Sequence, residues 1–357
     1  MRLEIFTPGH GAFMDSLIMY GLVSALRFSD VECYVSGTSG VFKIEVEESV
    51  RKVAELVADD IKNNCERIVV QLIDHLRVVQ KGSQRRLESY LSSHSNSEIV
   101  AKSLEKSYTT PGHAQNEGRY HKGQHVWLPF YPHIGKYFTG EYEYPPSNYG
   151  VCPTCIALAA LGFHRAAIPI QYKNASHVIL LSFDGEVSRK TLAEMLTFIK
   201  GDEFNQRIEK LRLAAEDLPL NIFTYVLLAN LTSSILRSLY ESKALWTALS
   251  TTFDVVKGQV VQIRGYEEIS IDKYLSSLIY LMRMDEKYDI DSLKKLGDIT
   301  EKLIRKKESA TIETLYRFIN TRSYSDLYMA TRQIVKALRE GFGKIFCEEL
   351  ACLTQLA

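Results

Sequence analysis

Hydrophobic and polar residues follow different periods in the two halves of the chain. In the first two hundred residues, the short segments "LEIF", "VECYVSG" and "VFKIEVE" alternate in the manner of β-strands. In the last of them Phe42, Ile44 and Val46 share one face. The segment "HVILLSF" is typical of a buried strand, and the dipeptide Asp184-Gly185 behind it predicts a turn.

Two helices are predicted among these strands. In "MDSLIMYGLVSALRF" the apolar residues recur at helical spacing, and Asp15 or Ser16 could cap the start. The segment "SRKTLAEMLTFIK" predicts a second helix, capped by Ser188. Together these patterns predict an α+β domain with a small, mostly antiparallel sheet over residues 1–201.

From about Asp202 the period becomes helical. Only "GQVVQIRGYEEISI" alternates like strands, which predicts a small hairpin. The chain from 202 to 357 is therefore predicted to form an all-α helical bundle domain. The predicted helical segments are Leu211 to Leu218, Ile222 to Tyr240, Ile271 to Met284, Leu293 to Ile304, Ile312 to Ile319, Leu327 to Leu338 and Ile345 to Leu353.

Length and composition agree with two folded domains. The chain has 357 residues, of which 24% are charged and 46% hydrophobic, and its formal net charge is zero. These values exclude a disordered or histone-like protein, although a local patch can still bind phosphate. Six irregularly spaced cysteines do not form a disulfide framework, so a reduced, cytoplasmic setting is expected. The apolar run from Asn221 contains Asn230 and Arg237, which favours a buried helix over a membrane span.

A long segment at about 77–147 is rich in turn residues and is predicted to be irregular. Between Arg77 and Lys136 nine basic residues stand against four acidic ones, interleaved with aromatic residues and histidines. Cations that neutralise phosphates beside rings that stack on bases are typical of nucleic-acid surfaces, although a solvated loop has the same composition. The candidate nucleic-acid-binding residues here are Lys81, Arg85, Arg86, Lys102, Lys106, Arg119, Tyr120 and Lys122.

The second half carries another basic stripe. Arg332, Lys336 and Arg339 stand at i, i+4 and i+7, so they share one face of the predicted helix. This face either binds phosphate or is a solvated helix surface.

The motif Cys152-Pro-Thr-Cys155 has two interpretations. Two thiolates can bind zinc if two further ligands are present. His121 and His125 are the nearest candidates for those positions, and His113 and His133 flank them. Alternatively, Cys152 stands near a helix cap with Pro153 in the first turn, and Cys155 packs on a buried face. The second interpretation is preferred, so no cofactor is expected.

Catalytic motifs are not found in the sequence. It has no phosphate-binding loop, no G-x-S-x-G elbow and no His-Glu-x-x-His. The chain is therefore not expected to be an enzyme. The alternative is a zinc-dependent, nucleic-acid-processing enzyme built on His121, His125, Cys152 and Cys155.

Two segments carry a family resemblance. "DSLIMYGLVSAL" and, far downstream, "NYGVCPTCIALAALGF" resemble the large subunit of the archaeal type I-A CRISPR interference complex (Cascade), the Csa-four or Cas-eight-a family. The order of an α+β half before a helical half and the chain length also agree with this family. In its pattern the cysteine pair opens an apolar helix, which favours the packing interpretation.

The resemblance implies a role and a set of partners. Such a subunit inspects the motif beside the target, helps to open the duplex and binds the displaced strand, while a guide RNA reads the target. The implied partners are the CRISPR guide RNA complex, target double-stranded DNA, the backbone and small subunits, and a helicase-nuclease that does the cutting. No membrane partner is implied. The site residues named above come from local charge and not from the resemblance.

Overall fold

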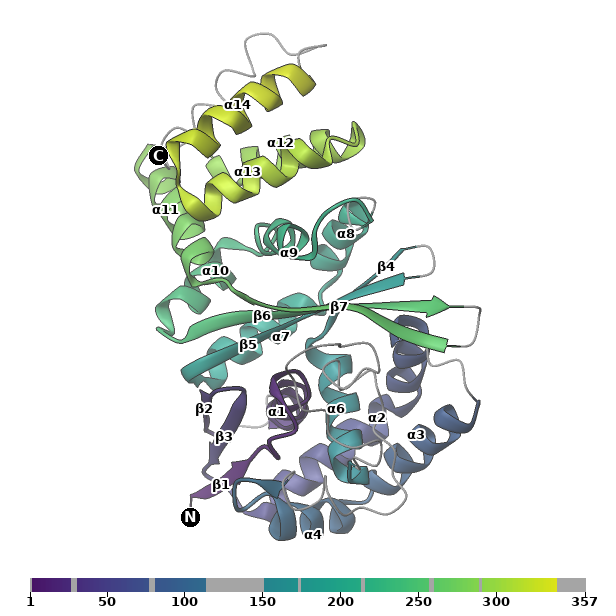
Figure 1. The fold of residues 1–357 in the computed structure, drawn as a ribbon. Coiled ribbons are helices and arrows are strands. Elements are labelled where there is room, and N and C mark those ends of the chain that lie inside the picture. The colour runs from purple at the N-terminus through teal and green to yellow at the C-terminus, as the bar shows by residue number, and fades with distance from the viewer. Residues whose placement is uncertain are drawn as a thin grey trace. The chain divides into compact units, whose positions relative to one another are not determined.

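The chain forms two compact units in the computed structural model, each described here by itself (Figure 1). The described residues are 2–26, 31–76, 81–113, 151–172, 175–212, 216–256, 260–288 and 291–338. Unit 1 comprises 1–200 and 249–268, and unit 2 comprises 201–248 and 269–357. Unit 1 thus takes in a hairpin from the second half of the sequence, which the sequence-based division at 201/202 assigned to the helical domain.

The sheet of unit 1 has the strand order β1-β3-β2-β5-β6-β7, and β4 pairs with β5 away from this path. The pairs β1–β3, β2–β3, β2–β5 and β4–β5 are all antiparallel, as the sequence predicted. The strands are β1 (Leu3–Phe6), β2 (Cys33–Thr38), β3 (Val41–Val46), β4 (Ile168–Tyr172), β5 (Ala175–Ser188), β6 (Leu245–Val256) and β7 (Val260–Ser270).

The predicted turn at Asp184-Gly185 is wrong, because β5 continues through it to Ser188. Gly185 adopts a φ of 110° and pairs with Gly37 of β2. A side chain on Gly37 would meet the Phe183 carbonyl oxygen at 2.3 Å, so the two strands can approach here only because glycine is present. A long-range strand pairing therefore overrides the local turn signal.

Two helices of unit 1 pack unusually closely, α1 (Ala12–Leu26) and α6 (Pro153–Ala166). A Cβ on Gly21 would lie 2.3 Å from the Leu158 carbonyl oxygen, and a Cβ on Gly162 would lie 1.7 Å from that of Leu17. Both helices are buried along almost their whole length. The two glycines therefore let the backbones of α1 and α6 touch in the core of unit 1.

Helix α1 is fixed to the sheet by its polar side chains. The Ser16 hydroxyl donates to Ser182 Oγ at 2.9 Å, and the Tyr20 hydroxyl donates to the Leu181 carbonyl oxygen at 2.7 Å. At its start, Asp15 accepts hydrogen bonds from the backbone N–H groups of Gly9 and Gly11 at 2.7 and 2.8 Å. Asp15 was predicted to cap this helix. It lies in the first turn, where its carboxylate holds the loop that precedes α1.

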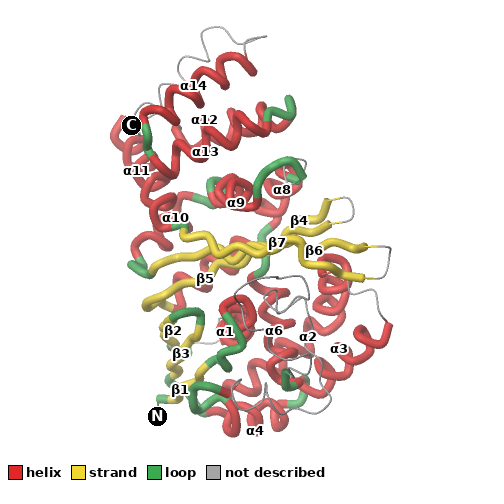
Figure 2. Tube along the Cα trace, in the orientation of Figure 1, coloured by secondary structure: helices red, strands yellow, loops and turns green. Residues whose placement is uncertain are grey.

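Three further helices of unit 1 surround this pair: α2 (Val50–Leu76), α3 (Lys81–His94) and α4 (Ser97–Ser107). In Figure 2, α1, α2 and α6 gather on one face of the sheet. The helix α7 (Arg189–Ile199) has the predicted N-cap, because Ser188 Oγ accepts from the Thr191 N–H.

Helices α3 and α4 correct the prediction of an irregular segment at 77–147. Leu87 and Leu91 are buried on α3, and Val100 and Leu104 are buried on α4, each pair at the i, i+4 spacing of a helix face. Asn96 caps α4 by accepting from the Glu98 N–H at 2.9 Å. The serine-rich stretch between the two helices thus forms the end of α3 and the cap of α4. Residues 114–147 of the segment lie outside the described residues.

Unit 2 is helical, as predicted. The apolar run predicted as one helix, Ile222 to Tyr240, forms two, because Thr232 caps a new helix by accepting from the Ile235 N–H. The helix predicted at Leu211 to Leu218 lies earlier, at Asp202–Leu211, and Ile345 to Leu353 lies outside the described residues. The helices of this unit are α8 (Asp202–Leu211), α9 (Leu220–Leu228), α10 (Ser233–Glu241), α11 (Asp272–Tyr288), α12 (Ser292–Arg305), α13 (Ser309–Thr321) and α14 (Tyr324–Leu338).

The core of unit 2 contains three buried tyrosines. The rings of Tyr225 and Tyr274 stack with their centroids 4.6 Å apart, and the Tyr274 hydroxyl donates to the Tyr225 carbonyl oxygen at 2.9 Å. The Tyr316 hydroxyl lies 3.0 Å from Thr300 Oγ1. Because the hydroxyls of Tyr274 and Tyr316 have partners, these two rings can be buried without the penalty of an unpaired polar group. The first bond joins α11 to α9, and the second joins α13 to α12.

Candidate functional site

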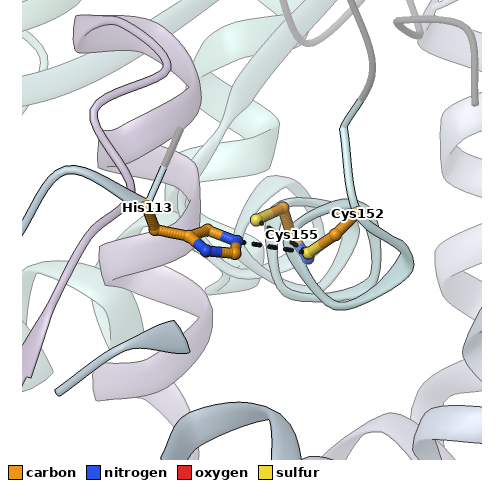
Figure 3. A group of neighbouring side chains, drawn as sticks. All are labelled: His113, Cys152 and Cys155. Carbon is orange, nitrogen blue, oxygen red and sulfur yellow. Dashed lines mark hydrogen bonds between the residues drawn. The ribbon is translucent and has the colours of Figure 1, made fainter. Parts of the chain in front are cut away.

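The start of α6 brings together the first group of chemically active side chains (Figure 3). Cys152 is the N-cap residue of the helix, its sulfur accepts from the Cys155 N–H, and Pro153 follows in the first turn. Both cysteines are buried. The predicted packing of this motif at a helix start is confirmed.

His113, which flanks the predicted ligand pair His121 and His125 in the sequence, lies beside these cysteines. His113 Nε2 lies 3.5 Å from Cys152 Sγ, and the two sulfur atoms are 3.2 Å apart. The Tyr108 hydroxyl is 3.0 Å from Cys155 Sγ. His113, Cys152 and Cys155 each offer a ligand atom within 4.8 Å of the other two. These three residues could hold a metal ion, whereas His121 and His125 lie outside the described residues.

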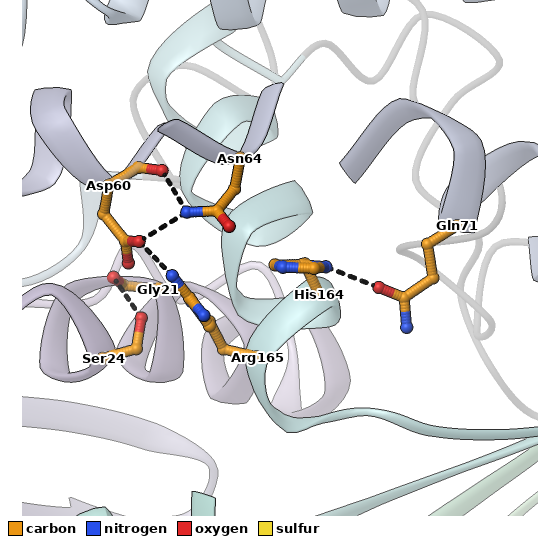
Figure 4. Close-up of polar contacts among 7 residues, drawn as sticks. All are labelled: Gly21, Ser24, Asp60, Asn64, Gln71, His164 and Arg165. Carbon is orange, nitrogen blue, oxygen red and sulfur yellow. Dashed lines mark hydrogen bonds and ion pairs between the residues drawn. The ribbon is translucent and has the colours of Figure 1, made fainter. Parts of the chain in front are cut away.

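A second polar cluster lies between α2 and α6 (Figure 4). Arg165 forms an ion pair with Asp60, whose side chain also accepts from the Asn64 amide at 2.9 Å. The residue that precedes Arg165 on α6, His164, has its Nδ1 2.7 Å from the side-chain oxygen of Gln71, which lies farther along α2. The side chains of Arg165 and Asp60 are only 12% and 7% exposed. These contacts fix the register of the two helices.

The N-terminus of α6 is also tied to α3. His94 Nδ1 is 2.8 Å from the Tyr90 carbonyl oxygen, which can only accept, so this nitrogen carries a proton. His94 Nε2 is 2.8 Å from Thr154 Oγ1 and is the acceptor in the neutral ring. Burial lowers the pKa of His94 below its usual value, so the ring stays neutral. His94 is therefore a structural histidine.

The predicted DNA-binding residues of the first half are distributed over two helices. Lys81 is the first residue of α3, Arg85 and Arg86 are exposed on the same helix, and Lys102 and Lys106 are exposed on α4. Glu88, Glu98 and Glu105 are also exposed on these helices, which dilutes the positive charge. Arg119, Tyr120 and Lys122 lie outside the described residues.

Helix α14 presents a face that the sequence predicted only in part. Arg332 and Lys336 are both exposed, and in the described part of the chain neither takes part in an ion pair. Two residues that were not predicted continue their line, Tyr328 at 65% exposed and Tyr324 at 73% exposed. The four side chains follow at i, i+4, i+8 and i+12, and we call them the α14 face. Arg339 lies outside the described residues.

The opposite side of α14 explains why this face points to solvent. Ala330, Ile334 and Leu338 are buried and also follow at i+4 spacing. Each of these residues stands two positions from a residue of the α14 face, so the buried side lies about 200° around the helix from that face. Helix α14 packs on α13 and α12 (Figure 1). Because its buried residues lie on the opposite side, the tyrosines and cations are exposed. The i+4 repeat of Tyr324, Tyr328 and Arg332 places these residues on one helix face in the sequence, but it does not tell whether that face is buried.

Unit 2 contains a cavity of about 510 Å³. It is lined by Arg207, Lys210 and Lys294 among others. Arg207 pairs with Glu203 at 2.6 Å, and Lys210 lies 3.9 Å from Glu301. These acidic partners offset the cations, so the cavity is a weaker candidate for phosphate than the α14 face.

One comparison with known proteins decides the family. Residues 3–345 match the model of a protein family described as CRISPR-associated protein (Cas_Csa4). The chain belongs to this family. The match confirms the expected membership of a CRISPR-associated family and gives no support to the alternative, a zinc-dependent enzyme. No curated protein sequence matches the chain.

The two segments that resemble this Cas family form the closest contact in unit 1. "DSLIMYGLVSAL" lies in α1 and "NYGVCPTCIALAALGF" contains α6 as far as Phe163, and Gly21 and Gly162 lie where these helices meet. Their backbone contact leaves no room for larger residues, which accounts for small residues at these points.

In the described part of this CRISPR-associated protein, no single helix is long and apolar enough to cross a membrane. Among the described helices, α9 and α10 together reach that length and apolar composition, but the pair is bent by 107° at the break between them.

Proposed function

We propose that this CRISPR-associated protein is the non-catalytic large subunit of a type I-A RNA-guided interference complex. The observation that carries the proposal is the family match along residues 3–345, which spans both units. In such a complex the guide RNA reads the target by base pairing, while a protein subunit inspects the adjacent motif and helps to open the duplex. Cleavage is left to a separate helicase-nuclease, and the complex works in the cytoplasm.

The α14 face supports a role in holding the displaced strand. Tyr324 and Tyr328 offer exposed rings on which bases can stack, and Arg332 and Lys336 follow at the spacing that suits a backbone of phosphates. Single-stranded nucleic acid is bound by this combination without reading its sequence. A displaced strand must be held whatever its sequence, so this chemistry fits the proposed role.

The exposed cations of α3 and α4 form the second proposed contact. Arg85, Arg86, Lys102 and Lys106 would neutralise phosphates of the target duplex. The backbone subunits, the small subunit, the guide RNA and the helicase-nuclease are the proposed partners of the remaining surface.

The test is target binding by the assembled complex at several salt concentrations. Arg332→Glu with Lys336→Glu should weaken binding to a target with an opened, displaced strand. Loss of two phosphate contacts should also make the slope of log K against log salt shallower by about 1.4, because each contact to single-stranded DNA contributes roughly 0.7. Tyr328→Ala should weaken binding by about 1–3 kcal/mol with little change of that slope, since base stacking is not ionic.

The matched control is Lys62→Glu with Lys273→Glu. Both lysines are exposed on helices, α2 and α11, and the change in net charge is the same. Binding by this control should stay close to that of the unchanged complex. If the control weakens binding as much as the α14 variant does, the effect is one of net charge and the α14 face has no special role. Cleavage of DNA by the isolated chain would contradict the non-catalytic assignment.

A further inference from the structure

The His113–Cys152–Cys155 cluster has no part in the DNA-binding proposal, yet its donor atoms converge (Figure 3). From this geometry we infer that His113, Cys152 and Cys155 bind a zinc ion. The ion joins the start of α6 to the end of the described segment 81–113. It is a structural ion, and the inference does not depend on the role of the chain in the CRISPR complex.

The chemistry of the donors selects zinc. Two thiolates and one imidazole are soft to borderline ligands, which suit zinc and do not suit magnesium or calcium. All three residues are buried, with His113 7%, Cys152 8% and Cys155 0% exposed. Structural zinc sites are closed in this way, whereas catalytic sites keep one position open to water or substrate.

The distances are close to those of a tetrahedral site. With zinc–sulfur and zinc–nitrogen bonds of about 2.3 and 2.0 Å, tetrahedral angles place a sulfur about 3.5 Å from a nitrogen and about 3.8 Å from a second sulfur. The distance between Cys152 Sγ and His113 Nε2 is 3.5 Å, and the two sulfur atoms are 3.2 Å apart. The third pair of donor atoms, from Cys155 and His113, lies within 4.8 Å. Zinc binding would require the two sulfur atoms to move about 0.6 Å apart.

Hydrogen-bond donors lie beside both sulfur atoms. Cys152 is the N-cap of α6, and its sulfur lies 3.4 Å from the Cys155 N–H, where the helix dipole stabilises negative charge. The Tyr108 hydroxyl, 3.0 Å from Cys155 Sγ, can donate to the second sulfur. Donors of this kind orient metal ligands and tune their basicity.

His10 is positioned to provide the fourth ligand. Its ring is 1% exposed, and its centroid lies 6.5 Å from that of His113. Two imidazoles on one tetrahedral zinc have centroids about 5 Å apart, so His10 must move by on the order of 1 Å. Asp15 holds the loop of His10 through the N–H groups of Gly9 and Gly11. The ion would thus connect this loop to α6.

The experiment is to measure the metal content of the full-length, tag-free chain, purified with a reducing agent and without chelators. Elemental analysis should give about one zinc per chain. Cys152→Ser with Cys155→Ser should remove nearly all of it, and His113→Gln most of it. Cys65→Ser is the matched control, because this cysteine lies on α2 and is only half-buried, and it should keep the metal.

A second measurement does not depend on folding of the variants. The unchanged chain, stripped of metal and given cobalt(II), should show the charge-transfer and visible bands of a tetrahedral thiolate site. The inference is overturned if the purified chain carries no metal and takes up neither zinc nor cobalt. It is overturned equally if zinc persists after both cysteines are replaced, or if Cys152 and Cys155 are found joined as a disulfide.

Discussion

The contact between α1 and α6 gives the sharpest prediction about stability, the effect of Gly162→Ala. The new Cβ would lie 1.7 Å from the Leu17 carbonyl oxygen and 3.0 Å from the Gly21 nitrogen. Since real Cβ contacts are not shorter than 3.0 Å, the two helices must separate by at least about 1.3 Å at this point. Both are backbone atoms in a buried helix, so no side chain can rotate away to make room.

The magnitude follows from the packing. Overpacking a core costs about 1–3 kcal/mol when side chains can adjust. Here a gap of more than 1 Å along the helix pair would also forfeit much of its dispersion energy. We therefore expect Gly162→Ala to lower the free energy of unfolding of unit 1 by at least about 3 kcal/mol, a large part of the 5–15 kcal/mol that is usual for a domain.

The assay is hydrogen exchange, read on peptides from α1 and α6. A loss of about 3 kcal/mol should speed their exchange by roughly two orders of magnitude, because each 1.4 kcal/mol corresponds to a factor of ten. The matched control is Gly297→Ala on α12, where an added Cβ meets nothing within 4 Å. That variant should be more stable by about 0.5–1 kcal/mol, as for an ordinary helical glycine. Unchanged exchange in Gly162→Ala would refute the close contact of the two helices.

Three further predictions concern buried ionisable groups. Burial raises the pKa of the Asp15 carboxyl from 3.8 to about 6. The folded chain therefore binds the carboxyl proton more tightly than the unfolded chain does. As a result, the free energy of unfolding falls as pH rises from about 4 to about 6. Urea unfolding at several pH values should show that the unchanged protein loses about 3 kcal/mol of its free energy of unfolding over that range, relative to Asp15→Asn. If the free energies of the two proteins ran parallel with pH, the prediction would be contradicted. Burial lowers the pKa of the His94 ring, so the free energy of unfolding should decrease as pH falls below 6.5. The variant His94→Phe should lack this part of the decrease. If the variant shows the same decrease as the unchanged protein, His94 is not responsible. Asp60→Ala leaves the Arg165 charge in the interior and should lower the free energy of unfolding by about 3–5 kcal/mol. The double variant Asp60→Leu with Arg165→Met removes both charges and should lose less. An equal loss in the two variants would contradict the pairing of Asp60 with Arg165.

Elements with a strong local signal could be predicted from the sequence. The alternating apolar residues of β3 and the Ser188 cap of α7 depend on near neighbours, and both are found where they were expected. Elements decided by distant contacts were missed. Gly185 lies in a strand because of Gly37, and α3 is helical because Leu87 and Leu91 find a core to pack against.

The candidate sites show the same limit. The cysteine motif was visible because its two members are neighbours, but His113 lies 39 residues before Cys152 and only the fold brings it within 3.5 Å. On α14 the charged residues were recognised and the tyrosines were not, because tyrosines at helical spacing are as typical of a core as of a surface. Their exposure, 73% for Tyr324 and 65% for Tyr328, required the structure.

The most direct test of the proposed function is to purify a tagged copy gently from its own cells, then sequence the RNA and identify the proteins that accompany it. We predict discrete short RNAs that share a repeat fragment, together with a repeating backbone subunit, because a guided complex must contain both. A chain that is recovered alone and free of RNA would contradict the assignment as a subunit of an RNA-guided complex.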